Sequence, residues 1–213
     1  MTIAVVPVKE LGAAKGRLSA RLAPRERREL VLAMLDDVLT ALSAARGLSG
    51  VIVVSREPEI ASIAARFGAE LLEEPIQAGD GYTHAVEHAV RELDRRGEPA
   101  LLSVPGDVPA VTPQEITQIL GAVQQIAVVL VPSRDERGTN AALIRPPGAL
   151  PLRFGEPSFA RHLDHARELG LSAAVLRLPG LSLDLDTPAD LDEFLRTPSP
   201  TRTYRLLSGQ IRP

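Results

Sequence analysis

The chain has 213 residues, enough to bury one substantial hydrophobic core, and this length fits a single folded domain. Its 24 Lys and Arg against 27 Asp and Glu give a formal net charge of −3, too balanced for a general binder of nucleic acids or anionic membranes. Cysteine is absent, which excludes disulfides and thiolate chemistry, and aromatic residues at 3% leave little surface for stacking on bases. We therefore expect a cytoplasmic protein without a membrane span that acts on small molecules rather than on nucleic acid.

Strand and helix patterns alternate along the first part of the chain. Runs of β-branched and apolar residues predict strands, and apolar residues at helical spacing predict helices. The expected strands are 2–8, 51–54, 70–72 and 100–104, and the expected helices are 24–45, 57–67, 81–96 and 112–123. The last of these helices opens with Thr112-Pro113-Gln114-Glu115, a capping box with proline at the first helical position.

The order of elements is looser after residue 126. The expected elements there are strands 127–131 and 141–144 around a polar segment, helix 158–169 with Ser158 as its cap, strand 173–178 and helix 187–195. We expect one domain over residues 1–196, followed by a Pro-rich tail over 197–213. Such alternation predicts an α/β fold, with a mostly parallel sheet flanked by helices and ligands bound beyond the carboxyl ends of its strands.

The loop after the first expected strand is rich in small and basic residues. Lys15 and Arg17 could neutralise phosphate charge, and small residues such as Gly12 let backbone amides approach an anion closely. Residues 1–28 carry seven basic side chains against two acidic ones, in a chain that is negative overall. The alternative is a solvated loop and helix start.

A second candidate site contains three aspartates. Asp184 and Asp186 lie two apart on an expected strand, so their carboxylates share one face and repel each other. A hard cation between them relieves that repulsion, and magnesium prefers carboxylate oxygens completed by water and phosphate. Asp107 ends another expected strand and could supply a further ligand. The alternative is that Asp186 serves the following helix and Asp184 is a solvated strand end.

A third candidate site offers hydrogen-bond donors. Gly138, Thr139 and Asn140 present backbone and side-chain donors, and Ser158 with the free amides of a helix start offers an anion pocket. A small phosphorylated acid would fit such donors. The alternative is an ordinary loop and an ordinary cap. We assign no catalytic role to the four histidines, which fall in expected helices.

Five motifs in order along the chain resemble the 2-phospho-L-lactate guanylyltransferase family of coenzyme F-420 biosynthesis, in which the phosphoenolpyruvate and 3-phosphoglycerate guanylyltransferases are included. They are Pro7-Val8-Lys9 with Ala14-Lys15-Gly16-Arg17-Leu18-Ser19, Gly106-Asp107-Val108-Pro109, Arg137-Gly138-Thr139-Asn140, Phe154-Gly155 with Ser158-Phe159, and Leu183-Asp184-Leu185-Asp186-Thr187-Pro188. The resemblance implies a Rossmann-like nucleotidyltransferase fold of the glycosyltransferase A type, with GTP and magnesium as requirements. It also implies guanylyl transfer onto a small phosphorylated three-carbon acid.

The resemblance assigns roles at matching positions. Asp107, Asp184 and Asp186 resemble the magnesium ligands. Thr139, Gly155 and Ser158 resemble the contacts to the acid, beside which we place Asn140. Lys15 and Arg17 resemble the triphosphate loop, and we add Lys9, Gly12 and Gly81 to the nucleotide site. Of these residues, we expect Lys15, Arg17 and Asp107 to act in catalysis.

Several alternatives stay open. The family usually has Gly-Leu-Asn at the start of the third helix, where this chain has Gly81-Tyr82-Thr83. A nucleotidyltransferase of another pathway, such as a molybdopterin guanylyltransferase or a sugar-phosphate type, usually has a longer Gly-rich loop. A non-catalytic nucleotide sensor has less need of three metal carboxylates. The identity of the acid and a homodimer are left open.

Overall fold

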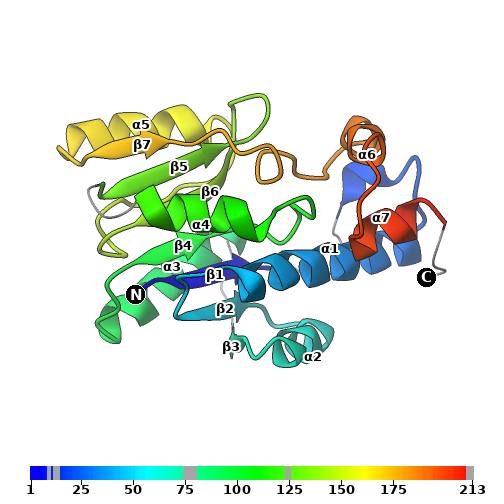
Figure 1. Cartoon of the computed structure of the whole chain (residues 1–213), viewed down its shortest axis with the longest axis horizontal. Coiled ribbons are helices and arrows are strands. Elements are labelled where there is room, and N and C mark those ends of the chain that lie inside the picture. Colours follow the sequence, from blue (N-terminus) through cyan, green and yellow to red (C-terminus); the bar gives the residue numbers. More distant parts are fainter. Residues whose placement is uncertain (9–10, 12–14, 74–80, 123–125, 210–213) are drawn as a thin grey trace.

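The chain folds around one mixed β-sheet. Its strands are β1 (Ile3–Pro7), β2 (Gly50–Val54), β3 (Glu70–Leu72), β4 (Leu101–Ser103), β5 (Val128–Pro132), β6 (Thr139–Ile144) and β7 (Ala173–Val175). They lie in the order β3-β2-β1-β4-β6-β5-β7 in the computed structural model (Figure 1). The structure describes residues 1–213 except 9–10, 12–14, 74–80, 123–125 and 210–213. Only β6 is antiparallel to its neighbours β4 and β5, so the predicted mostly parallel sheet is confirmed.

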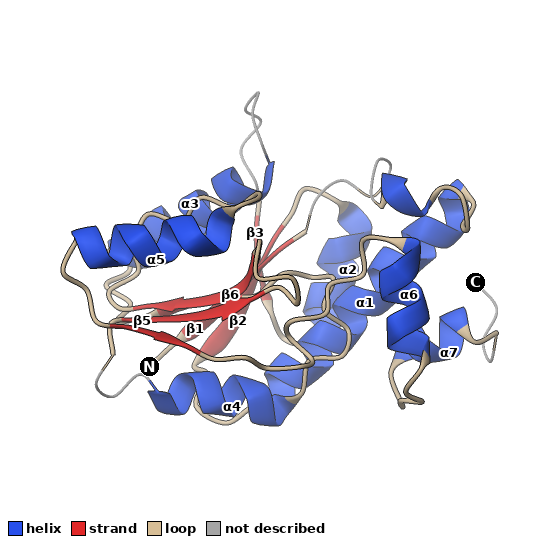
Figure 2. Cartoon of the chain, turned by 90° about the horizontal axis from the view of Figure 1, so that it is seen from above, coloured by secondary structure: helices blue, strands red, loops and turns tan. Residues whose placement is uncertain are grey.

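Helices cover both faces of the sheet (Figure 2). They are α1 (Pro24–Ala44), α2 (Pro58–Arg66), α3 (Gly81–Arg95), α4 (Pro113–Gly121), α5 (Ser158–Glu168), α6 (Pro188–Leu195) and α7 (Arg202–Leu207), with a short 3-10 turn η1 (Gly16–Leu18). Side chains of α1, α2 and α4 pack on one face, whereas those of α3 and α5 pack on the other. The result is a three-layer α/β sandwich.

The alternation of side chains along β1 shows how the sequence builds these layers. Ala4 and Val6 point into the core beneath α1, whereas Val5 points into the core beneath α3. All three are fully buried, as expected for a strand with helices on both faces. Aliphatic side chains fill nearly the whole core, in keeping with the 3% aromatic content.

The predicted helix starts are largely confirmed. The Thr112 hydroxyl accepts the Glu115 N–H while the Glu115 carboxylate accepts the Thr112 N–H, which is the expected capping box at α4. Thr187 and Asp190 do the same at α6. The prediction that Ser158 caps α5 is wrong: Pro157 occupies the cap position, and Ser158 is the first helical residue.

Many element ends differ from the expected ones by one or two residues, and three differences bear on the site or the sheet. β7 ends at Val175, short of the expected residue 178. β6 begins at Thr139, so Thr139 and Asn140 lie on a strand rather than in the polar loop. Residues 183–186 form no strand and lie outside the sheet.

The Pro-rich C-terminal segment contains α7, which packs on α1. The Asp37 carboxylate on α1 accepts the backbone N–H groups of Arg202 and Thr203, at 2.7 and 2.8 Å. Thr203 is fully buried, and Figure 1 shows α6 and α7 side by side at one end of α1. The composition of this segment did not indicate that contact, and a domain boundary at residue 197 stays a prediction.

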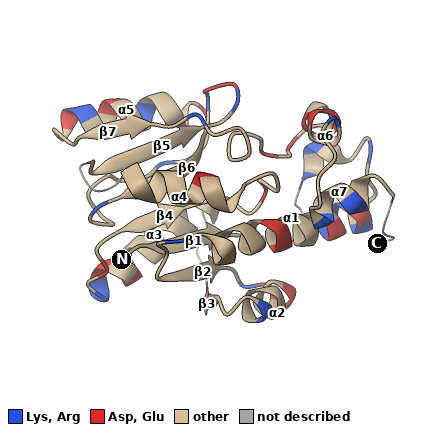
Figure 3. Ribbon diagram, in the orientation of Figure 1, with Lys and Arg blue, Asp and Glu red and all other residues tan. Residues whose placement is uncertain are grey.

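In the view of Figure 3, charged residues of both signs are interspersed along the helices and loops of the described residues. This distribution agrees with the small net charge. Within the described part of the chain, no helix is both long enough and apolar enough to cross a membrane.

Candidate active site

Three strands bring the candidate residues to one edge of the sheet. β1 and β4 are parallel, so the segments after Pro7 and after Ser103 leave the sheet at the same edge. β6 runs antiparallel to β4, with Ser103 opposite Ala142, so Thr139 and Asn140 at its start lie at that edge too. Because β6 is reversed, its amino end lies at the same edge of the sheet as the carboxyl ends of β1 and β4.

The aspartate segment 183–186 reaches this edge through backbone and core contacts. The Leu185 N–H donates to the Asp107 carbonyl oxygen at 3.0 Å, and the Leu185 side chain is fully buried. Asp184 and Asp186 flank this anchor, and both line the same cavity as Asp107. The expected strand is absent, but the expected convergence of the three aspartates on one cavity is present.

Lys15 lies between two of these aspartates. Its ammonium donates to Asp107 Oδ2 at 2.6 Å and to Asp186 Oδ1 at 2.5 Å, and the side chain is 8% exposed. Its backbone has φ +56°, in the left-handed region. Burial by itself lowers the pKa of Lys15, but Asp107 and Asp186 outweigh it and raise the pKa above its usual value. Lys15 is therefore a fixed cation at the point where a metal ion was expected.

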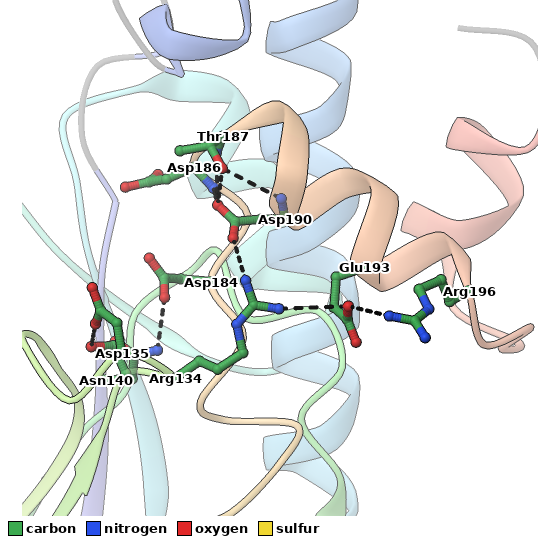
Figure 4. Close-up of polar contacts among 10 residues, drawn as sticks. Arg134, Asp135, Asn140, Asp184, Asp186, Thr187, Asp190, Glu193 and Arg196 are labelled. Carbon is green, nitrogen blue, oxygen red and sulfur yellow. Dashed lines mark hydrogen bonds and ion pairs between the residues drawn. The ribbon is translucent and has the colours of Figure 1, made fainter.

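Asp184 is held separately from the lysine. Asn140 Nδ2 donates to Asp184 Oδ1 at 3.0 Å and to the Leu181 carbonyl oxygen at 2.9 Å (Figure 4). Burial, and then the nearby Asp107 and Asp186 carboxylates, raise the pKa of Asp184, and the Asn140 bond offsets this only in part. Among the described residues, no three His, Cys, Asp or Glu side chains are grouped so as to hold a metal ion. The carboxylates share a cavity, but they do not form a ready ligand cluster.

Two adjoining cavities open at this edge. The larger, of about 690 Å³, is lined by the predicted residues Arg17, Asp107, Thr139, Asn140, Gly155, Ser158, Asp184 and Asp186. The smaller, of about 300 Å³, is more apolar and lies against Lys15, Val8 and Met34. Tyr82, Pro105, Asp107 and Asp186 line both. Gly81 begins α3 without lining either cavity, and Lys9 and Gly12 lie outside the described residues.

Thr139 and Ser158 form a buried polar corner of the larger cavity. Ser158 Oγ accepts the Thr139 N–H at 3.0 Å and lies 3.4 Å from Thr139 Oγ1. The Ser158 hydroxyl therefore binds the backbone of β6 instead of an N–H group of its own helix, and for this reason Ser158 does not cap α5. Gly155 has φ +95°, a conformation that favours glycine, and Arg161 donates to its carbonyl oxygen at 2.7 Å.

The family described as guanylyl transferase, CofC-like, matches residues 2–210 of this chain. The chain belongs to this CofC-like family. It is 50% identical over 193 residues to a phosphoenolpyruvate guanylyltransferase from Sphaerobacter thermophilus, covering 91% of this chain and 92% of that protein. It is 36% identical to a 2-phospho-L-lactate guanylyltransferase from Methanothermobacter thermautotrophicus, over 91% of this chain and 84% of the relative. The protein is therefore a nucleotidyltransferase of the guanylyltransferase type.

A solved structure confirms the fold of this CofC-like chain. A nucleotide-diphospho-sugar transferase from Desulfovibrio desulfuricans superposes with a TM-score of 0.79, covering 98% of this chain and 94% of that one. The sequence identity of that pair is 19%, so the likeness extends to the fold alone. The predicted Rossmann-like nucleotidyltransferase fold is confirmed.

The sequence analysis missed several residues at the site of this CofC-like enzyme. Tyr82 lines both cavities, and its ring meets Phe154 edge-on with centroids 4.6 Å apart. Burial, with a smaller contribution from Asp107, raises the pKa of the Tyr82 phenol above its usual value, so the phenol stays neutral. Arg134 lines the larger cavity and pairs with Asp190 and Glu193 of α6 (Figure 4). Tyr82 lies in the Gly81-Tyr82-Thr83 segment that differs from the family pattern, and Arg134 lies three residues before the Arg137-Gly138-Thr139-Asn140 motif; these positions are the signals that could have indicated them.

Proposed function

We propose that this enzyme transfers GMP from GTP onto the phosphate of a small phosphorylated three-carbon acid, as a step toward coenzyme F-420. One observation carries the proposal: Thr139, Gly155 and Ser158 line the same cavity as the three aspartates. An anion-binding corner and a carboxylate cluster in one cavity suit two phosphorylated reactants meeting there. Phosphoenolpyruvate is the first acceptor to test, because the relative that shares half of its residues is named for it.

The chemistry follows from the charges of the reactants. A phosphate oxygen of the acceptor attacks the α-phosphorus of GTP, a new P–O–P bond forms, and the bond to pyrophosphate breaks. The acceptor phosphate is already ionised near neutral pH, so no general base is required. Both reactants are anions, so the enzyme's main task is to hold them together and offset their repulsion. Lys15 and Arg17 supply positive charge where the triphosphate would lie.

The residues at this site fit a magnesium ion. Asp107, Asp184 and Asp186 offer carboxylate oxygens, the ligands that magnesium prefers. The position of Lys15 supports a cation site there, because its ammonium already bridges two of the three carboxylates. Magnesium bound by these residues would screen the phosphate charges of the nucleotide. Lys15 would then be released from the carboxylates and could face the triphosphate.

A pyrophosphate-release panel tests the proposal. It crosses GTP, ATP, CTP and UTP with phosphoenolpyruvate, 2-phospho-L-lactate, 3-phosphoglycerate and a sugar phosphate, each with and without magnesium. We expect release with GTP and a three-carbon acid only, and only when magnesium is present. Release with the sugar phosphate alone would reject the acceptor class and favour a transferase of another pathway, whereas release without magnesium would reject the metal.

Two further expectations remain proposals of their own. A cytoplasmic location is one of these proposals. A homodimer is a proposal that a sedimentation measurement would test directly.

A further inference from the structure

His162 lies in α5 behind the polar corner of the larger cavity and has both ring nitrogens in hydrogen bonds. It is 2% exposed. Nε2 lies 2.9 Å from the Arg153 backbone nitrogen, and Nδ1 lies 2.9 Å from Thr139 Oγ1. A backbone N–H can only donate, so Nε2 must be the acceptor. In a neutral ring the proton is then on Nδ1.

The surroundings keep the imidazole neutral and fixed in orientation. Burial, assisted by the nearby Arg161 and His165, lowers the pKa of His162 to about 4. The Phe154 ring meets the imidazole edge-on, with centroids 5.5 Å apart and planes at 74°. The ring therefore presents the same donor and the same acceptor throughout the neutral pH range.

This arrangement determines what the Thr139 hydroxyl can do. Thr139 Oγ1 accepts the proton of His162 Nδ1, so its own hydrogen must point elsewhere. In the long contact of 3.4 Å with Ser158, Ser158 Oγ is the donor and Thr139 Oγ1 the acceptor, so this contact does not use the Thr139 hydrogen either. Thr139 lines the larger cavity, where its hydroxyl hydrogen can reach an anionic oxygen. A hydroxyl restricted to donating in this direction favours an anion over a neutral group.

We propose that His162 is a positioning residue for the acceptor: it holds the Thr139 hydroxyl as a donor toward the phosphorylated acid and anchors the Arg153 backbone beside Gly155. The inference rests on the proposed function, because that function supplies the acceptor. His162 itself does not line the cavity, so it acts through Thr139 and the loop. The guanine nucleotide is not predicted to depend on it.

The first test needs no substrate. Long-range ¹H–¹⁵N NMR of the wild-type protein at pH 7 distinguishes the two neutral tautomers of histidine, and variants at His84, His88 and His165 identify the remaining signal as His162. We expect a neutral ring protonated at Nδ1. A ring protonated at Nε2, or a cationic ring, would overturn the inference whatever the enzyme's substrates are.

The second test compares three variants by steady-state kinetics. His162→Asn keeps a donor near the position of Nδ1, His162→Gln keeps an acceptor near that of Nε2, and His162→Phe keeps neither. We expect the acceptor KM to rise roughly 10- to 100-fold in the Phe and Gln variants, with Asn restoring most of the loss and the GTP KM little changed. Equal losses for both substrates in all three variants would indicate a merely structural role and overturn the proposal.

A double variant distinguishes an effect of His162 that acts through the Thr139 hydroxyl from a general effect on packing. In a Thr139→Val background the donor is already gone, so adding His162→Phe should raise the acceptor KM by much less than it does in the wild type. Full additivity of the two changes would contradict the proposed coupling. If the wild-type protein releases no pyrophosphate with any of the three acids, the proposed function fails, while the NMR result still decides the state of His162.

Discussion

At the scale of single residues, Lys15 and the three aspartates form the feature on which the proposed activity depends. Two carboxylates share one buried ammonium, and the third accepts a hydrogen bond from the neutral amide of Asn140. Part of the negative charge of these carboxylates is therefore uncompensated, which is the basis for the proposed magnesium site. Two substitutions test this reading.

Replacing Lys15 should increase the response to magnesium. In Lys15→Met, Asp107 and Asp186 face each other without their shared ammonium, so magnesium meets no competitor. We expect Mg²⁺ to raise the melting temperature of the variant more than that of the wild type. Arg17→Met, which removes an exposed cation that lines the adjoining larger cavity, is the matched control. Equal magnesium shifts in Lys15→Met and wild type would mean that the ion does not bind at these carboxylates.

Asp184→Asn should separate stability from activity. Burial raises the pKa of Asp184, so the folded state holds that proton more tightly than the unfolded chain, and the charged form costs stability once the pH exceeds the folded pKa. We expect the ligand-free variant to have a higher unfolding free energy than the wild type at pH 7, and this difference should vanish as the pH falls below the ordinary aspartate pKa of 3.8. Turnover should fall about 100-fold or more. Chemical denaturation and pyrophosphate release measure the two effects, and unchanged release would refute the proposed metal role.

At the scale of elements, the loop before α5 contains a glycine with positive φ that lines the larger cavity together with Thr139 and Ser158. Gly155 has φ +95°, and a Cβ there would meet no neighbouring atom, so Gly155→Ala adds backbone strain without a clash. We expect a loss of about 1 kcal/mol in unfolding free energy and a raised acceptor KM. Gly97, with φ +69° and equally open space, is the matched control. Gly97→Ala should lose similar stability with unchanged kinetics, and a KM change common to both variants would contradict the local role of the loop.

The contact between α1 and α7 is a second prediction at this scale. The Asp37 carboxylate accepts two N–H groups at the start of α7, so Asp37→Ala leaves them without a partner. We expect a loss of about 1 to 2 kcal/mol and faster hydrogen exchange over residues 203–208, with kinetic constants unchanged because no residue of α7 lines either cavity. Asp36→Ala, which removes only ion pairs with Arg66 and Arg202, is the control and should leave the exchange of α7 nearly unchanged.

At the scale of the whole molecule, stability should depend on pH through His162. The unfolded chain binds a proton at this histidine below about pH 6.5, whereas the folded state binds it only below about pH 4. Because the unfolded state then holds the extra proton, stability falls as the pH drops through this window. We expect the wild type to lose about 3 kcal/mol more than His162→Phe between pH 7 and 4. Denaturant titrations between pH 7 and 4 measure the unfolding free energy of both proteins. An equal loss in the wild type and in His162→Phe would contradict the prediction.

The sequence alone was enough to predict the layers of the fold. Hydrophobic periodicity reports which face of an element is buried, and proline, threonine and glutamate mark helix starts, so most elements and the caps at Thr112 and Thr187 were found. The motifs also indicated the residues of the larger cavity, including Asp107, Thr139 and Ser158. Periodicity, helix caps and motifs each depend on residues that are close together in the chain, so they can be recognised from the sequence alone.

Only the tertiary structure decided how those residues meet. The reversal of β6 brings Thr139 to the edge where β1 and β4 end, and no local pattern encodes the direction of a neighbouring strand. The bridge from Lys15 to Asp107 and Asp186 spans 92 and 171 residues, and the contact of His162 with Thr139 spans 23. Hydrogen-bond partners and buried charges depend on distances between segments that are remote in sequence. The sequence thus determined the elements and the chemical groups available, whereas packing determined which groups face each other.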